Sequence, residues 1–363
     1  MCTDMATGAM SFIKEHLMWD RVIRTPEQLR ATRRLLAQLP KVELHAHLAA
    51  SIPERLVREA AEKHGVRFPD PSHPYRFEGG FHEFLLVYEQ VVDVFRTPEE
   101  LARATYESLA AEAARSNLRY REMHYPPALS RHLDYVESVQ AIADGIERAR
   151  RETGVDARII IAIYRNQGRQ AAEQLAADMI AHPHPLVVGL GIEAEGTVAP
   201  IEWFHDAYAS IREAGYPVTA HAEEHVDAEE ALYDLHSLGC RRIDHGYALA
   251  GDPDAAAAVR EAGVHLAATW IGASDRFGKT PDNPIRTLLE QGLDVSISSD
   301  APGISGISLN EFLEDALVSL QLPDRYLVEQ NFSQLDHAWL GDEEKAAIRA
   351  EITSALAGAG FDA

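Results

Sequence analysis

The sequence predicts an α/β fold, a (β/α)₈ TIM barrel with helical additions at its N-terminal and C-terminal ends. Short apolar or β-branched runs alternate along the chain with longer amphipathic runs, which is the pattern of repeated strand and helix units. The runs at 158–163 and 186–190 are apolar without alternation, as expected of parallel strands that are covered on both faces. Because the chain has eight strand-like runs, we expect a closed barrel rather than an open sheet.

The expected strands are separated, in nearly every case, by a segment that reads as a helix. They lie at 42–48, 120–125, 157–163, 186–193, 217–221, 242–245, 264–269 and 294–299. Parallel strands of a barrel all point the same way. Residues at their carboxyl ends therefore share the face on which barrel enzymes carry their chemistry.

Three segments lie outside the repeated units. Residues 1–38 are expected to form an extension that is helical from about residue 8, and residues 65–116 to insert a proline-rich turn and two helices over the barrel mouth. Residues 323–357 are expected to add C-terminal helices. Because α/β barrels reach about 250 residues and more as single domains, we expect residues 1–363 to form one domain.

The charge of the chain restricts its partners. A formal net charge of −23 repels phosphate backbones and anionic lipid surfaces, so we expect a small-molecule substrate, no nucleic acid and no membrane. The chain has no run of apolar residues long enough to span a bilayer. Residues 1–20 mix charged and apolar positions where a secretory leader needs a continuous apolar stretch, which indicates a cytoplasmic protein.

Two histidines, His45 and His47, end the first expected strand. A spacing of two residues puts both imidazoles on the same side of a strand, where both can reach one metal ion. The chain has 17 histidines, so such a pair also arises by chance, and two ordinary structural histidines are the alternative. The pair indicates a metal site only if metal-binding residues also lie at the ends of other strands.

Three further strands end in residues that bind metals or transfer protons. His221 closes the fifth expected strand and Glu224 follows it, His245 closes the sixth, and Asp300 follows the eighth. An acid such as Glu224 beside a ligand suits proton transfer, although acids also favour helix starts. Since barrel closure brings the first strand beside the eighth, four strand ends with such residues are unlikely to be coincidence.

The donor set favours one zinc ion. Three histidines and one aspartate, His45, His47, His221 and Asp300, suit zinc, although iron, cobalt or nickel can use the same ligands. The two cysteines, Cys2 and Cys240, are too few for a thiolate zinc site. A two-metal barrel hydrolase commonly bridges its ions with a modified lysine, and the chain has no lysine between residues 64 and 278.

Four segments resemble the motifs of the adenosine deaminase family, in order and at suitable separations. They are Pro40-Lys-Val-Glu-Leu-His-Ala-His-Leu, Thr219-Ala-His-Ala-Glu-Glu, Asp244-His-Gly-Tyr and Ser298-Ser-Asp-Ala-Pro. Weaker similarity at 117–125 and 283–289 extends the resemblance, which spans residues 40–320. It implies a metal-dependent amidohydrolase in which His45, His47, His221 and Asp300 bind zinc.

The resemblance also implies the catalytic roles. Zinc would lower the pKa of a bound water toward about 7. Asp300 would accept the proton of that water, and His245 would orient the resulting hydroxide for attack on a carbon that bears an amino group. Glu224 would be the acid that protonates a neighbouring ring nitrogen and helps ammonia depart.

The substrate-contact positions depart from the family pattern. Ala49 and Ala50 stand where the family has Asp-Gly, whose carboxylate approaches a ribose, and Ala301 replaces the second of two aspartates. Ala194 stands at the backbone contact to the purine, and 268–272 replaces the usual Cys-Pro-x-Ser pattern. A site that loses its hydrogen-bonding groups can lose orders of magnitude against the original substrate, so we expect adenosine to be a poor substrate.

These departures predict a reshaped, more apolar pocket. Trp270 and Phe84 are candidates to line it beside Ala194, although both aromatic residues can equally be core residues. We expect hydrolytic deamination of an amino-substituted heterocycle, such as a modified purine, a pterin or a related nucleobase or nucleoside. Hydrolysis of another C–N bond in a cyclic amidine, by ring opening or amine release, is an alternative. A third is an inactive barrel that acts as a binding protein, against which the retained Glu224 and His245 argue.

Overall fold

Eight parallel strands form the centre of the fold, which a computed structural model describes for residues 19–222 and 227–359. They form two four-stranded sheets, ordered β1-β2-β3-β4 and β5-β6-β7-β8. The strands are β1 (Lys41–His47), β2 (Leu118–Tyr125), β3 (Asp156–Tyr164), β4 (Val187–Glu193), β5 (His221–Ala222), β6 (Arg242–His245), β7 (His265–Thr269) and β8 (Asp294–Ser298). All except β5 lie within two residues of the bounds expected from the sequence.

Strand β5 is shorter than expected because the residues before it pair only once. Leu190 N donates to Pro217 O at 3.2 Å and Thr219 N donates to Leu190 O at 2.9 Å, which makes an isolated bridge between Leu190 and Val218. Proline has no N–H with which to extend the ladder. The segment 217–220 therefore joins β4 without forming a regular strand, where we expected one over 217–221.

Isolated bridges join the two sheets at both pairs of edges. The Leu190–Val218 bridge connects β4 to the segment that enters β5, and a bridge between Ala46 and Asp300 connects β1 to the end of β8. At the second junction His47 N donates to Asp300 O at 2.9 Å. The eight strands thus follow one another around the (β/α)₈ barrel that the sequence predicts, with their carboxyl ends on one face.

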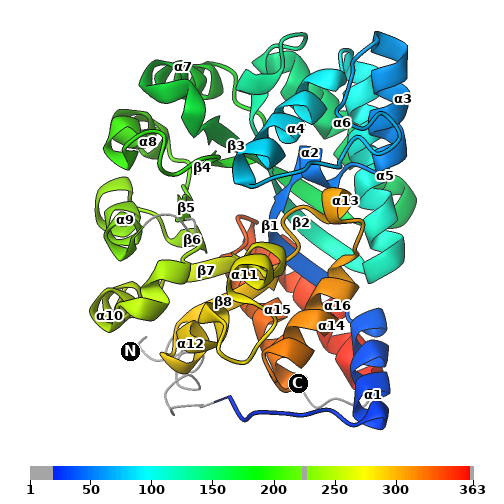
Figure 1. The fold of residues 1–363 in the computed structure, drawn as a ribbon, viewed down its shortest axis with the longest axis vertical. Coiled ribbons are helices and arrows are strands. Elements are labelled where there is room, and N and C mark those ends of the chain that lie inside the picture. Colours follow the sequence, from blue (N-terminus) through cyan, green and yellow to red (C-terminus); the bar gives the residue numbers. More distant parts are fainter. Residues whose placement is uncertain (1–18, 223–226, 360–363) are drawn as a thin grey trace, which may run out of the picture.

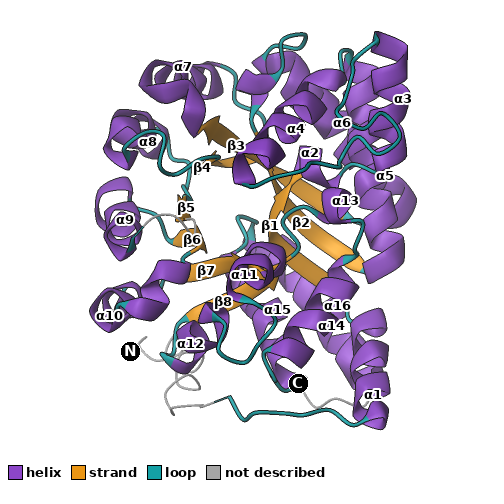
Figure 2. Ribbon diagram, in the orientation of Figure 1, coloured by secondary structure: helices purple, strands orange, loops and turns teal. Residues whose placement is uncertain are grey.

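Helices surround the strands on the outside, as Figures 1 and 2 show. Strand β3 is buried along nearly its whole length, which is the environment that its apolar run predicts. No helix in the described ranges combines the length and apolar character needed to cross a membrane. The helices that accompany the strands are α2 (Leu48–Ser51), α3 (Glu54–His64), α6 (Tyr135–Thr153), α7 (Gly168–Ala181), α8 (His205–Glu213), α9 (Ala228–Tyr233), α10 (Pro253–Glu261), α11 (Trp270–Phe277), α12 (Pro284–Glu290), α13 (Pro302–Ser305) and α14 (Leu309–Ser319).

The added segments are mostly helical. The N-terminal helix α1 (Pro26–Gln38) begins later than expected, because Thr25 and Gln28 form a capping box in front of Pro26. Residues 19–25 are not helical, and residues 8–18 of the expected helix lie outside the described ranges. The insertion 65–116 holds α4 (Phe81–Val94) and α5 (Pro98–Ser116), and the C-terminal segment holds α15 (Arg325–His337) and α16 (Asp342–Ala359).

Candidate metal centre and active site

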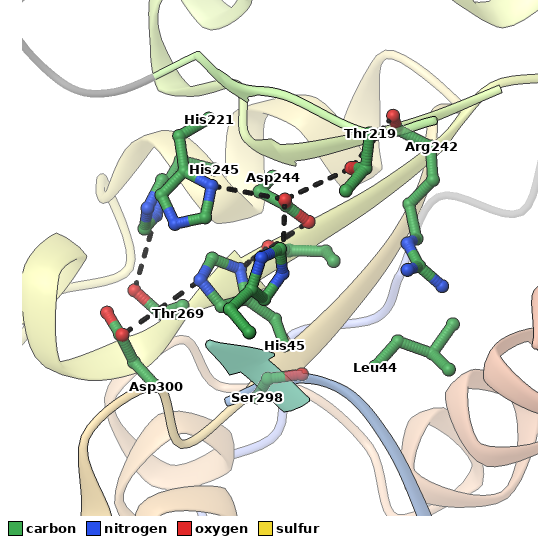
Figure 3. A network of polar contacts seen from close by, with 12 residues as sticks. Leu44, His45, Thr219, His221, Arg242, Asp244, His245, Thr269, Ser298 and Asp300 are labelled. Atoms are coloured by element: carbon green, nitrogen blue, oxygen red, sulfur yellow. Dashed lines mark hydrogen bonds and ion pairs between the residues drawn. The ribbon is translucent and has the colours of Figure 1, made fainter. Parts of the chain in front are cut away.

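The four expected metal ligands lie together at the carboxyl ends of the strands. His45 and His47 belong to β1, His221 to β5, and Asp300 follows β8. Asp300 Oδ1 lies 3.4 Å from His47 Nε2 and 3.9 Å from His45 Nε2, and His221 Nε2 lies 3.1 Å from His47 Nε2. Figure 3 shows the imidazoles of His45, His221 and His245 gathered beside Asp300 and Asp244.

All three histidines of the expected ligand set direct Nε2 toward the centre of the cluster and Nδ1 toward an outer partner. His45 Nδ1 lies 2.9 Å from the Ala267 carbonyl oxygen, and His47 Nδ1 lies 2.9 Å from Glu193 Oε2. His221 Nδ1 lies 3.2 Å from Asp244 Oδ2. The partners of His45 and His47 only accept hydrogen bonds, so the Nδ1 of each of these two rings carries a proton and Nε2 is the atom left to bind a metal ion. Such outer partners fix the orientation of metal-bound histidines.

The donor atoms of His45, His47 and Asp300 lie close enough together to share one metal ion. Ligand bonds of about 2.1 Å require ligand atoms roughly 3.4 Å apart, close to the observed separations. One ligand atom from each of His45, His47 and Asp300 lies within 4.8 Å of the others. His45 Nε2 is buried and has no hydrogen-bond partner among the described residues, so this lone pair points into the centre unsatisfied. The residues present therefore fit a resident metal ion.

Burial and charge separate the protonation states of the imidazoles. Burial lowers the pKa of His45 to about 4 and that of His245 well below its usual value, so both rings are neutral near pH 7. For His47, burial alone would lower the pKa, but the Glu193 and Asp300 carboxylates raise it to about 9. His47 would therefore have to release the proton that these carboxylates favour on its ring before Nε2 could bind a metal ion.

Three residues at strand ends have a left-handed backbone without being glycine. These are Ala194 after β4 (φ 82°), His245 at the end of β6 (φ 68°) and Asp300 after β8 (φ 63°). This conformation is strained for residues with a Cβ and persists where the surrounding structure enforces it. All three residues line the same cavity, so this backbone strain lies at residues that form the site.

His245 lies against the rings of two expected metal ligands and faces the cavity. Its ring centroid is 4.7 Å from that of His45 and 5.0 Å from that of His221, and it lines the cavity. Its Nδ1 is 3.4 Å from the hydroxyls of both Tyr247 and Thr269. Glu224, the expected acid, lies outside the described residues.

Two buried carboxylates support the ligands from behind. Asp244 accepts a hydrogen bond from Thr219 Oγ1 at 3.0 Å and faces His221. Burial alone would raise the pKa of Asp244, but the neighbouring imidazoles, first that of His45, hold it well below its usual value. Glu43 accepts hydrogen bonds from the backbone N–H of Ser299 at 2.7 Å and from its hydroxyl at 2.6 Å, which fixes the chain immediately before Asp300.

A cavity of about 410 Å³ opens above the metal ligands. Its floor is formed by site residues that include His47, His221 and Asp300, whereas its wall is largely apolar. Most of that wall comes from the insertion and from helices at the barrel mouth: Phe77, Phe81, Phe84, Leu85, Tyr88, Ile271 and Ile304.

The structure separates the three candidate substrate-contact residues. Phe84 and Ala194 line the cavity. Trp270 does not belong to the residues that line it. Its side chain is fully buried, and its indole N–H donates to Asp315 at 2.7 Å. Trp270 thus has the environment of a core residue, because the first turn of α11 points it away from the cavity and toward α14.

Sequence reasoning did not identify Glu193, Asp244 or Tyr88 as site residues. Glu193 closes β4 and Asp244 precedes His245, so the strand-end argument used for the metal ligands could have found both. Tyr88 lies four residues after Phe84, on the same face of α4. Its helical spacing from a candidate pocket residue was the available signal.

Comparison with known proteins gives a consistent family assignment. The family model described as adenosine deaminase matches residues 40–355. An adenine deaminase from Rhizobium leguminosarum bv. trifolii is 30% identical over 325 residues, which cover 86% of this chain and 99% of the relative. An adenosine deaminase from Aliivibrio fischeri is 26% identical over 328 residues, covering 87% of this chain and 98% of the relative.

A solved structure agrees with both. An amidohydrolase from Burkholderia ambifaria, with bound zinc, superposes with a TM-score of 0.84 at 27% identity and covers 94% of this chain and 98% of its own. The matched range 40–355 spans every expected metal ligand as well as Glu224 and His245. The chain therefore belongs to the adenosine deaminase family of metal-dependent amidohydrolases, the hydrolases that cleave C–N bonds as deaminases do.

Proposed function

We propose that the protein is a zinc-dependent hydrolytic deaminase of an amino-substituted purine or a closely related heterocycle. The observation that carries this proposal is that His45, His47 and Asp300 can share one ion beside a cavity, with His45 Nε2 buried and unpartnered. His221 Nε2 lies 3.1 Å from His47 Nε2 and can add the fourth ligand. One zinc ion held by these four residues would supply a water whose pKa is lowered toward about 7.

The remaining residues of the site handle protons and orientation. Asp300 lines the cavity beside the histidine nitrogens, where its carboxylate can take the proton of the attacking water. His245 is neutral and faces the same point, so it can hold the nucleophile by a hydrogen bond. We assign to Glu224 the proton delivered to the ring nitrogen next to the reacting carbon, which makes that carbon electrophilic and lets ammonia leave.

The cavity supports a flat and largely apolar substrate. Aromatic rings of the insertion stack along α4, with centroids 5.8 Å apart for Phe81 and Phe84 and 6.2 Å apart for Phe84 and Tyr88. Such a surface favours a planar heterocycle. Ala301 and Ala194 line the cavity without offering a polar side chain, so the substrate makes fewer polar contacts there than adenosine would require.

The proposal is tested by an ammonia-release screen of aminopurines, aminopterins and their nucleosides with the zinc-loaded enzyme. Mass spectrometry of the products distinguishes deamination, which leaves the ring intact, from ring opening or loss of a substituted amine. We expect ammonia and an intact oxo-heterocycle from at least one purine-like compound, with adenosine poor. No ammonia from any of these compounds would contradict the proposal.

A further inference from the structure

Two polar groups of the cavity wall have no role in the chemistry described above. Glu193 ends β4 and Tyr88 lies on α4, and both line the cavity next to His47. Glu193 Oε2 lies 2.9 Å from His47 Nδ1, and the ring of Tyr88 meets the His47 ring edge to face with centroids 5.9 Å apart. The two groups therefore border the metal centre on its His47 side.

One oxygen of each group is left without a well-formed hydrogen bond. Glu193 Oε1 and the Tyr88 hydroxyl are buried, and neither makes a hydrogen bond of normal geometry with any residue in the described ranges. Burial, and then the charge of the Glu193 carboxylate and a hydrogen-bond contact with it, raise the pKa of Tyr88 well above its usual value, so the phenol keeps its proton. A buried polar atom without a well-formed hydrogen bond destabilises the structure, and a ligand that supplies the missing partner removes that penalty.

The two oxygen atoms determine which hydrogen-bonding groups a ligand must present to them. A carboxylate oxygen only accepts hydrogen bonds, so Glu193 Oε1 requires an N–H or O–H donor. A protonated phenol can donate, so the Tyr88 hydroxyl suits an unprotonated ring nitrogen. A free purine base has such an edge, where the N–H of the five-membered ring lies beside a nitrogen of the six-membered ring. A nucleoside has lost that donor to the glycosidic bond.

Sugar hydroxyls could also donate to Glu193, but the surrounding wall does not suit a sugar. Phe77, Phe81 and Leu85 form the adjacent apolar surface, and Ala49, at the position whose side chain approaches ribose in the family, is buried and carries no polar group. The remaining charged lining residues, Asp275 and Arg276, are exposed on α11. Most hydroxyls of a ribose would thus face apolar side chains.

We propose that Glu193 and Tyr88 form a subsite for the N–H edge of a free heterocyclic base, so that the enzyme acts on the base and discriminates against its nucleoside. This inference rests on the proposed deaminase function for its substrate. It adds that Glu193 and Tyr88 form hydrogen bonds with the edge of the base to which a sugar would be attached.

The test compares adenine with 9-methyladenine and adenosine as substrates of the zinc-loaded enzyme. The methyl group removes the donor without adding a sugar. We expect kcat/KM for adenine to exceed that for 9-methyladenine by on the order of 100-fold, since a site built to bond a donor rejects analogues that lack it. Equal or better turnover of 9-methyladenine or adenosine would overturn the inference.

Calorimetric binding of the reaction products keeps this test separate from the deaminase proposal. Hypoxanthine should bind at least 10-fold more tightly than 9-methylhypoxanthine or inosine, even if no ammonia is released from adenine. Selective binding of hypoxanthine without ammonia release would contradict the deaminase proposal and support the subsite. Hypoxanthine binding that is absent, or no tighter than that of the two derivatives, counts against the subsite whatever the turnover.

The variant Tyr88→Phe removes only the hydroxyl. We expect it to raise KM for adenine and to narrow the preference for adenine over 9-methyladenine about three- to tenfold, with zinc content unchanged. Tyr106→Phe is the matched control, because it removes a phenolic hydroxyl that donates to Glu152 on the surface at 2.6 Å. An unchanged preference in Tyr88→Phe, or an equal change in both variants, would show that Tyr88 does not read the base.

Discussion

Two clusters of histidine and aspartate lie at opposite ends of the barrel strands. The metal centre occupies the carboxyl ends. The second cluster, which we call the amino-end cluster, consists of His265 and Asp294, the first residues of β7 and β8, together with His337 at the end of α15. One ligand atom from each of these three residues lies within 4.8 Å of the others, as in the metal centre. By composition and spacing alone the two clusters are similar.

Their hydrogen bonds and ring planes differ. In the amino-end cluster Asp294 is satisfied by Ser333 at 2.6 Å and by His265 Nδ1 at 3.1 Å, and His337 Nδ1 lies 3.0 Å from the Ser333 carbonyl oxygen. The rings of His265 and His337 stack at 22°, so their in-plane lone pairs run side by side.

In the metal centre the imidazoles are steeply inclined to each other, at 53° for His45 and His221 and 71° for His47 and His221. Their lone pairs can therefore meet at one point. The two clusters thus differ in that the expected metal centre has inclined rings and an unpartnered His45 Nε2, whereas the residues of the amino-end cluster satisfy one another.

The largest effect is expected when one histidine is removed from each cluster, which tests which of the two clusters binds zinc. His221→Ala should lose zinc and, with it, nearly all turnover, because three ligands remain and the water loses its activation. His337→Ala is the matched control and should retain both. Zinc content by mass spectrometry and ammonia release measure the outcome. Zinc retained in His221→Ala, or lost in His337→Ala, would reverse our assignment of the two clusters.

Next in size is the effect of Glu224→Gln, which separates metal binding from proton transfer. We expect turnover to fall by about 10²–10⁴-fold, the usual contribution of a general acid, while zinc stays bound. Steady-state ammonia release together with metal analysis measures both properties. Turnover close to that of the unmodified enzyme would mean that another group delivers the proton.

A smaller effect is expected from Asp244→Asn, which keeps the shape of the support behind His221 but removes its charge. We expect zinc affinity to fall about 10- to 100-fold, as for other outer partners of metal-bound histidines. Chelator competition gives the affinity, and circular dichroism checks that the fold is kept. If a folded variant bound zinc as tightly as the unmodified protein, Asp244 would have no positioning role.

The smallest effect concerns stability and belongs to the amino-end cluster. Burial alone would raise the pKa of Asp294, but His265, Ser333 and His337 hold it at about 2. A depressed pKa contributes stability above the unfolded value near 4, and this contribution is lost as the pH falls toward 2.

Asp294→Asn should therefore lower the free energy of unfolding at pH 7 by only about 1 kcal/mol, because the carboxylate is 41% exposed and solvent screens it. Urea unfolding at pH 7 and at pH 3 measures the difference between variant and unmodified protein, which should shrink at the lower pH. A difference of the same size at both values would contradict a charge-based contribution.

Much of the fold and of the metal centre was predictable from the sequence because both depend on periodic or local signals. Apolar runs located seven of the eight strands to within two residues. The rule that chemistry lies at carboxyl strand ends selected His45, His47, His221 and Asp300, which the structure places close together. The same rule gave no reason to choose His265, because that residue begins a strand instead of ending one.

What the sequence could not provide is the direction of individual side chains. Trp270 and Phe84 were equivalent candidates, yet only Phe84 lines the cavity, because the tertiary packing of α11 directs Trp270 toward Asp315. The short β5 depends on a single bridge to Leu190, a non-local contact. The unpartnered oxygen of Glu193 likewise appears only when all its neighbours are placed.

The most direct test of the central claim, a one-zinc deaminase centre at His45, His47, His221 and Asp300, is a zinc titration of the chelator-stripped protein. Ammonia release from the best purine-like substrate is measured after each addition. We predict activity that rises linearly to one equivalent of zinc per chain and then stays level. Full activity in the stripped protein, or a rise that continues to two equivalents, would contradict the account.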